Sequence, residues 1–194
     1  MLRSLLVFVL LAFSASASAE GFSYNYLTLG YGNTDFDVVN ADGDGFTLGA
    51  SYGFTDNVHA FAGYDTADLE SVVDLNRFRI GIGYNTGLSD TVDMYARLSY
   101  ESIDFDLPPV GVPLGVDTDD SGYGFGVGVR FRAMDQLELN AGIKHVDYSD
   151  LGDDTGFEAG GVYSFNNTWS LGLHGEFSDD VSTYTVSGRF YFGR

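Results

Sequence analysis

Three residues in the last quarter of the chain could support acid/base chemistry: Glu158, His174 and Glu176. His174 and Glu176 are two residues apart in a stretch that alternates apolar and polar residues, so they would share one face of a strand. Glu158 lies in the preceding stretch of this kind and would face them. An imidazole beside two carboxylates can transfer protons. The same groups could equally join an ion-pair network with Lys144.

A second pair with this chemistry, His145 and Asp147, also shares one strand face near a connection. Proton transfer alone does not make a nucleophile, and no serine is placed to be activated by either histidine. We therefore predict a protein without enzymatic activity and without catalytic residues.

The basic residues follow the same alternation. Apart from Arg3 and Arg194, all of them occupy the polar phase of an alternating stretch, namely Arg77, Arg79, Arg97, Arg130, Arg132, Lys144 and Arg189. The acidic residues that share this phase are Asp93, Glu101, Glu138, Glu158 and Glu176. Hairpin pairing would set Arg77 opposite Glu101, Arg132 opposite Glu138 and Lys144 opposite Glu158. We predict an internal charge network that either plugs the interior or lines a narrow wet channel.

The stretch Gly122–Arg132 shows the alternation most clearly. Its odd positions are all apolar, whereas its even positions are glycine or arginine. Strict alternation at period two predicts a strand whose two faces meet different environments. Because the polar face carries arginine and bare backbone, lipid outside and a polar interior explain the pattern better than a water-soluble sandwich.

Ten such stretches follow one another along the chain. They are 22–31, 46–54, 58–65, 77–85, 92–101, 122–132, 137–144, 157–165, 169–177 and 184–192. Each has about ten residues, enough to cross a bilayer at the usual tilt. The predicted fold class is all-β, a closed antiparallel transmembrane β-barrel of ten strands, with eight strands as the alternative. In the first stretch the apolar phase changes near Tyr26, which a bulge or an interfacial tyrosine belt would explain.

Tight turns alternate with acidic connections between these stretches. The connections predicted to be long are 32–44, 66–75 and 105–120, and the last holds all three prolines. Residues 40–45 match the first half of an EF-hand calcium loop, but the acid required at its twelfth position is Ser51, so no calcium site is expected. We interpret the acids in the connections as a solvated rim.

The ends and the composition limit the remaining possibilities. Residues 1–19 have a basic start, an apolar core and a small-residue ending, which predicts a cleaved signal peptide followed by one barrel domain, residues 20–194. Without Arg3, 8 basic residues stand against 28 acidic ones, and this excess of negative charge excludes nucleic acid as a partner. Cysteine is absent, which excludes disulfides and thiolate metal sites. We expect no cofactor and no metal.

Three segments carry a resemblance to a known family: Glu20–Tyr26, Gly81–Asn85 and the aromatic final strand ending at Phe192. With them the chain resembles the outer membrane protein beta-barrel domain family of Gram-negative bacteria. The resemblance implies a place in the cell outer membrane and insertion by the outer-membrane assembly machinery, which reads the last strand. Family members usually finish on an aromatic residue, whereas here Gly193 and Arg194 follow Phe192.

The function we expect from the charge network and the acidic connections is structural. We predict a monomeric, non-enzymatic barrel that contacts outer-membrane lipid and lipopolysaccharide and acts in envelope structure or surface interaction. Divalent ions bridging the acidic connections to lipopolysaccharide phosphates are a further possibility. The alternative function is a narrow, porin-like diffusion pore for small solutes.

Overall fold

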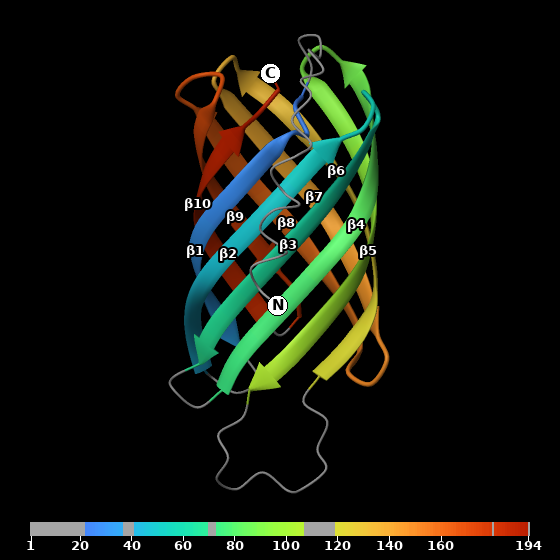
Figure 1. Ribbon diagram of the computed structural model, residues 1–194, viewed down its shortest axis with the longest axis vertical. Helices are drawn as coiled ribbons and strands as arrows, with labels where there is room; N and C mark the ends of the chain where they lie inside the picture. The colour runs from blue at the N-terminus through green and yellow to red at the C-terminus, as the bar shows by residue number, and fades with distance from the viewer. Residues whose placement is uncertain (1–21, 37–40, 70–72, 107–118, 180, 194) are drawn as a thin grey trace, which may run out of the picture.

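Ten antiparallel strands close into a barrel in the computed structural model, which describes residues 22–36, 41–69, 73–106, 119–179 and 181–193 (Figure 1). The strands are β1 (Tyr26–Phe36), β2 (Ala41–Gly53), β3 (Val58–Leu69), β4 (Val73–Ser89), β5 (Val92–Asp106), β6 (Asp119–Met134), β7 (Leu137–Tyr148), β8 (Gly152–Ser164), β9 (Trp169–Phe177) and β10 (Val181–Tyr191). The predicted fold class is confirmed, and the eight-strand alternative is wrong. The predicted signal peptide and the three prolines lie outside the described residues.

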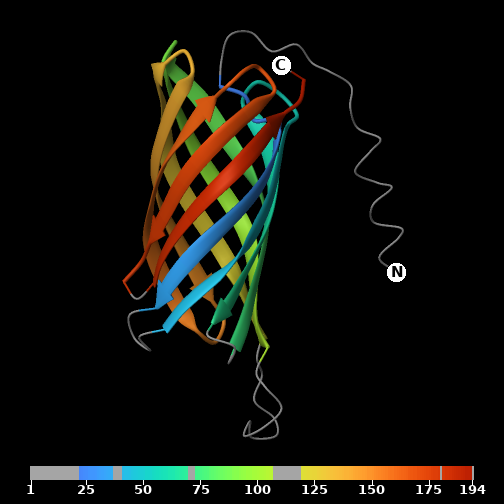
Figure 2. The same ribbon diagram turned by 90° about the vertical axis from the view of Figure 1, so that its left-hand side faces the viewer.

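Each strand pairs with its neighbours in sequence, and β1 pairs with β10 to close the ring. All strands tilt in the same sense around the barrel axis in both views (Figures 1 and 2). The amide of Phe192 donates a hydrogen bond to the carbonyl of Asn25 at 3.2 Å, so the chain enters and leaves at the same end. We call this the turn end, because the short connections 54–57, 90–91, 135–136 and 165–168 lie there. The opposite end is the loop end.

The core of this barrel is inverted relative to a water-soluble protein. Leu29 and Ile82 face outward with exposed fractions of 60% and 58%, whereas Glu101 faces inward with 0%. Buried positions include aspartate, glutamate, arginine and histidine side chains beside only a few apolar ones. The alternation along each strand therefore separates an apolar outer surface from a polar lumen, as in a transmembrane barrel.

The outer surface has an aliphatic band between two aromatic rings. Exposed aromatic side chains at the turn end are Phe54, Tyr84, Phe131, Tyr163, Phe165 and Trp169. Those nearer the loop end are Tyr31, Phe46, Tyr64, Tyr100, Tyr123, Phe157 and Tyr184. Aromatic rings of this kind lie at the two interfaces of a bilayer, because their amphipathic side chains favour the headgroup level.

No helix in the described part of the chain has the length and apolarity needed to cross a membrane.

The strands extend further toward the loop end than the sequence predicts. The predicted connection 32–44 is wrong, because β1 continues to Phe36 and β2 begins at Ala41, with Asp35 opposite Asp42. The predicted connection 66–75 likewise shrinks to residues 70–72 between β3 and β4. Apolar alternation stops where the lipid stops, whereas the backbone hydrogen bonds continue into the polar segments beyond. The longest interval between described strands, residues 107–118 between β5 and β6, lies outside the described residues.

The change of apolar phase near Tyr26 has a different cause from the two considered. β1 pairs with β2 and β10 without a register shift, so there is no bulge. Leu27 and Leu29 face outward, while Tyr26 faces the lumen and its ring lies 4.1 Å from the guanidinium carbon of Arg189. The ring of Tyr26 is largely apolar, but it faces the lumen, where it packs against the charged guanidinium of Arg189.

Placing a charge on the lipid-facing band tests this orientation. Ile82→Arg should lower the free energy of unfolding by about 2–4 kcal/mol, because it puts a guanidinium at mid-bilayer depth. Ser102→Arg, which also faces outward but lies at the level of the loop-end aromatic ring, opposite Phe78, should cost about 0–1 kcal/mol. Urea unfolding of both variants in lipid vesicles measures the difference, and equal costs would contradict the assignment of the band.

Candidate functional site

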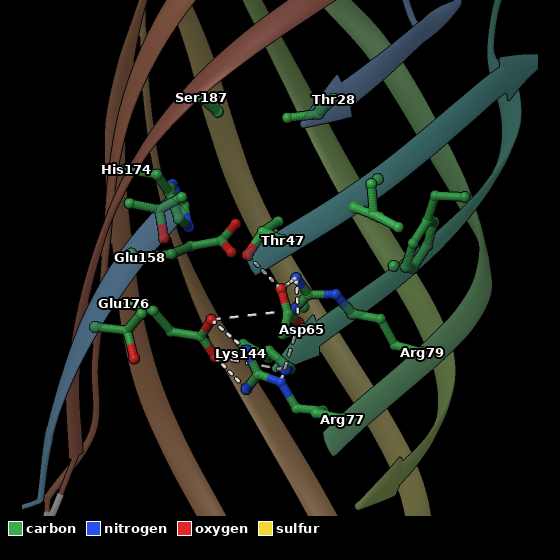
Figure 3. Close-up of a pocket in the computed structure, with 18 of the residues that line it drawn as sticks. Thr28, Thr47, Asp65, Arg77, Arg79, Lys144, Glu158, His174, Glu176 and Ser187 are labelled. Carbon is green, nitrogen blue, oxygen red and sulfur yellow. Dashed lines mark hydrogen bonds and ion pairs between the residues drawn. The ribbon is translucent and has the colours of Figure 1, made fainter. Parts of the chain in front are cut away.

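The lumen contains two layers of polar side chains, and the first lies toward the loop end (Figure 3). Arg77 donates from Nη1 and Nη2 to the two carboxylate oxygens of Glu176, each at 3.1 Å. β4 and β9 are five places apart in the ring of ten strands, so they lie on opposite sides. This bidentate ion pair therefore spans the lumen from wall to wall.

We call the Arg77–Glu176 ion pair the brace. Other ion pairs surround it. Asp65 on β3 lies 3.3 Å from Arg77 Nε and 3.1 Å from an Nη of Arg79. Lys144 Nζ on β7 lies 2.9 Å from the carboxylate of Glu101 and 3.6 Å from that of Glu176. Three cations and three carboxylates thus neutralise one another in a region that water reaches poorly, where an unpaired charge would be costly.

The second layer closes the turn end. The phenol of Tyr24, in the segment before β1, donates to Asp93 at 2.7 Å, and its ring stacks on that of His59 with centroids 4.1 Å apart. Arg130 forms an ion pair with Glu138 at 2.7 Å and donates to the carbonyl of Ser23. Tyr24, His59 and Arg130 have exposed fractions of 5%, 1% and 4%. We call Ser23, Tyr24, His59, Asp93, Arg130 and Glu138 the seal.

Two details show how closely the seal is fitted. Gly83 lies against the His59 ring, and a side chain at this position would clash with that ring. Burial raises the pKa of the Tyr24 phenol, with the hydrogen bond to Asp93 acting in the same direction and Arg130 opposing both. The phenol therefore stays protonated and continues to donate to Asp93.

Between the two layers, and reaching the loop end, lies a cavity of about 380 Å³ lined by all ten strands. It extends from Arg130 and Glu138, two members of the seal, to Thr34 and Val181 near the loop end. The wall formed by β10, β1 and β2 is mostly small residues apart from Tyr26, Leu48 and Arg189, and these small residues include Thr28, Gly32, Thr34, Gly45, Thr47, Gly49, Thr183, Thr185 and Ser187. Because the long charged side chains of the first layer come from the other walls, the open space lies beside these small residues.

The hairpin registers predicted from the sequence are partly wrong. Arg132 is opposite Glu138, as predicted. Arg79 rather than Arg77 is opposite Glu101, because β4 continues to Ser89, past its predicted end at residue 85, and the chain turns at residues 90–91. Glu158 is opposite Gly142 rather than Lys144. The physical reason is that the β7–β8 connection, residues 149–151, is shorter than predicted and moves the register by two.

The remaining residues of the predicted network also face the lumen, but several have aromatic rather than ionic partners. Glu158 accepts a hydrogen bond of 2.5 Å from the phenol of Tyr95. Arg97 lies over the rings of Tyr95 and Phe61, and Arg189 over that of Tyr26. Arg132 lies over the ring of Phe22 at the rim of the turn end.

The prediction missed Asp65 and the lumenal tyrosines Tyr24, Tyr26 and Tyr95. Asp65 shares its phase with Phe61 and Gly63 on β3, and that shared phase was the available signal.

The two carboxylates of the predicted acid/base group, Glu158 and Glu176, are hydrogen-bonded to other side chains. Glu158 lies opposite Glu176, as predicted, and His174 lies opposite Gly160. Both oxygens of Glu176 are held by Arg77. His145 donates to or accepts from Thr155 at 2.8 Å on the exposed surface.

No group of three or more His, Asp or Glu side chains among the described residues is arranged to hold a metal ion. Asp42 to Gly45, from the half-match to a calcium loop, belong to the extended strand β2 rather than to a turn.

A ring of exposed aspartates surrounds the loop end on the outside, and we call it the acidic collar. Its members stand directly opposite one another on adjacent strands, as the pairs Asp35–Asp42, Asp68–Asp74, Asp104–Asp119 and Asp147–Asp153. Like charges directly opposite each other destabilise a sheet. These acids were predicted to lie in connections, and most of them lie instead on the ends of strands, beyond the aromatic ring.

The sequence model of the family described as outer membrane protein beta-barrel domain matches residues 5–177, so the chain belongs to this family. No curated protein matches the chain.

Several solved structures share the fold. The NanC porin has a TM-score of 0.58 at 8% identity, covering 86% of this chain and 100% of that chain. The β domain of the Bordetella autotransporter BrkA has 0.53 at 11%, covering 87% and 99%. The KdgM porin in complex with disordered oligogalacturonate has 0.50 at 10%, covering 86% and 99%. At these identities the likeness concerns the fold alone, and with the family it points to the outer membrane.

The brace across the lumen can be tested by removing one partner. Arg77→Met should lower the free energy of unfolding by roughly 2–3 kcal/mol, because it leaves Glu176 and Asp65 short of a cation in a poorly solvated interior. The double variant Arg77→Met/Glu176→Gln should regain about 1 kcal/mol or more. Chemical unfolding in vesicles measures both, and strictly additive losses would show that the two side chains do not interact.

Because the aspartates of the acidic collar face one another, we predict that divalent cations stabilise the folded protein. Mg²⁺ should raise the unfolding temperature by screening the opposed aspartates. Asp42→Asn/Asp153→Asn should raise stability in chelator by roughly 0.5–2 kcal/mol and reduce the gain from Mg²⁺. The control Asp135→Asn, at the turn end, should change neither. An equal Mg²⁺ effect in all three proteins would contradict the role of the collar.

Proposed function

We propose that this chain is a non-enzymatic outer-membrane barrel, closed toward the periplasm, that acts in envelope structure or surface interaction. The observation that carries the proposal is the seal, in which Tyr24, His59 and Arg130 are at most 5% exposed. Outer-membrane barrels have their short turns on the periplasmic side, so the turn end faces the periplasm. A solute entering from outside would meet the cavity and then a closed floor.

The surface available for interaction is therefore on the cell exterior. The acidic collar lies just beyond the loop-end aromatic ring, at the depth where lipopolysaccharide headgroups carry their phosphates. Divalent cations held between carboxylates and phosphates would relieve the repulsion between the opposed aspartates. We propose lipopolysaccharide and outer-membrane lipid as the surrounding partners of a monomer inserted by the outer-membrane assembly machinery.

The absence of enzymatic activity is part of the proposal and rests on the engaged carboxylates. Glu176 is bound by Arg77, and Glu158 by Tyr95. A general base must reach the proton that it abstracts, and these two carboxylates are already occupied.

The second candidate is a narrow diffusion pore, favoured by the cavity of about 380 Å³ that contacts every strand. In this reading the segment containing Ser23 and Tyr24 would move to open the floor. The two candidates differ in one property, the conductance of the unmodified barrel.

Planar-bilayer recording of the refolded protein tests the proposal. The wild-type barrel should insert without discrete openings. Tyr24→Ala should produce openings, because it removes the ring between His59 and Arg130 and the hydrogen bond to Asp93. Tyr24→Phe keeps the ring and should remain closed.

Discrete openings of the wild-type protein that depend on salt concentration would reject the closed barrel in favour of the pore. Insertion is verified separately by protease protection, so that a silent bilayer is not mistaken for an empty one.

A further inference from the structure

Buried polar atoms without a protein partner gather on the floor of the cavity. Among the described residues, five buried side-chain atoms have no hydrogen-bond partner: Thr28 Oγ1, Ser51 Oγ, His59 Nε2, Arg97 Nε and Arg189 Nε. Thr28, Arg97 and Arg189 all line the cavity, whereas Ser51 and His59 do not. A buried donor left unpaired costs about 1–3 kcal/mol, so these three groups would gain from a ligand that accepts hydrogen bonds.

The charges of Arg97 and Arg189 are not paired. Neither guanidinium lies within 4.0 Å of a carboxylate in the described chain, unlike those of Arg77, Arg79 and Arg130. Arg97 instead lies 4.4 Å from the ring centroid of Tyr95, and Arg189 lies 4.1 Å from that of Tyr26. Aromatic faces hold a guanidinium in place and leave N–H groups for a planar acceptor, although Nη1 of Arg189 also donates to the hydroxyl of Tyr191 at 3.3 Å.

These two arginines come from opposite walls of the barrel. β5 and β10 are five places apart in the ring of ten strands. Both line the same cavity, and Arg189 lies directly opposite Thr28 on β1.

The nearest carboxylates are engaged elsewhere. Glu158 and Glu138 line the same cavity, but neither forms an ion pair with Arg97 or Arg189 in the described chain. Glu158 is bound to Tyr95, and Glu138 forms its ion pair with Arg130. Arg97 and Arg189 therefore have no carboxylate at ion-pair distance in the described chain, although Glu158 keeps its negative charge in the same cavity.

We propose that Arg97, Arg189 and Thr28 form a binding site for a small oxyanion, a carboxylate or a phosphate, at the floor of the lumen. Guanidinium groups match the planar geometry of such anions. The hydroxyls of Thr185 and Ser187 on the adjoining wall offer neutral hydrogen bonds, which suits a hydroxylated molecule. The ligand enters from the loop end, so the site does not depend on whether the barrel conducts.

Isothermal titration calorimetry of the refolded full-length barrel in low-chloride buffer tests the site. The probes are gluconate for a carboxylate, inorganic phosphate for a phosphate, and glucose as a neutral molecule of similar size to gluconate. Saturable binding of gluconate or phosphate, without binding of glucose, is expected, and whichever binds identifies the anion class.

Variants separate this site from general attraction by positive charge. Arg97→Gln and Arg189→Gln should each weaken binding at least tenfold. The matched control Arg132→Gln removes the same charge at the turn end but lies outside the cavity lining, and it should leave the affinity within twofold. Circular dichroism confirms that each variant is folded.

No saturable binding of either anion by the folded protein would overturn the proposal. Equal weakening in Arg132→Gln would overturn it as well, because the binding would then reflect net charge alone. If Arg97→Gln does not fold, Arg97→Lys keeps the charge but loses the planar fork, and an unchanged affinity in that variant would also count against the site.

Discussion

The constraint on which the structure depends is that lipid surrounds the barrel, so the charged groups within the membrane must lie inside it. A charge at bilayer depth is costly unless it faces an interior and is paired there. The lumen meets this requirement with cross-barrel contacts such as Arg77 to Glu176, which tie opposite strands together. The apolar outer surface and the polar core are two consequences of the same alternation along the strands.

The lumenal groups divide into regions with different roles. The ion pairs toward the loop end compensate one another and brace the wall. The seal excludes solvent from the turn end, because Tyr24, His59 and Arg130 pack with almost no exposure. Between them, small residues on β10, β1 and β2 leave space, and Arg97 and Arg189 carry charge that no protein carboxylate neutralises at close range. We propose that such a barrel is closed on one side and receives a molecule from the other.

Period-two alternation was sufficient to predict the number of strands and the direction in which most charged side chains point. β9 has the bounds expected from the sequence, because its apolar phase runs along its whole length. The ion-pair partners of the lumenal charges could not be predicted from hairpin registers, because such registers relate only adjacent strands. Arg77 and Glu176 pair across the closed barrel. Strand ends such as Asp35 and Asp42 were missed because hydrogen bonding continues where the apolar signal stops. Tyr24 and Tyr26 were ambiguous because a tyrosine ring suits either lipid or a lumenal arginine.

Side-specific labelling of one lumenal cysteine tests most directly whether the lumen opens only at the loop end. The chain has no cysteine, so Ser187→Cys introduces a single thiol on the cavity wall. With the barrel inserted in one orientation in vesicles, a membrane-impermeant maleimide is added to the loop side or the turn side. The closed barrel predicts rapid labelling from the loop side and none from the turn side. Labelling at similar rates from both sides would contradict it, because reagent could then pass the seal.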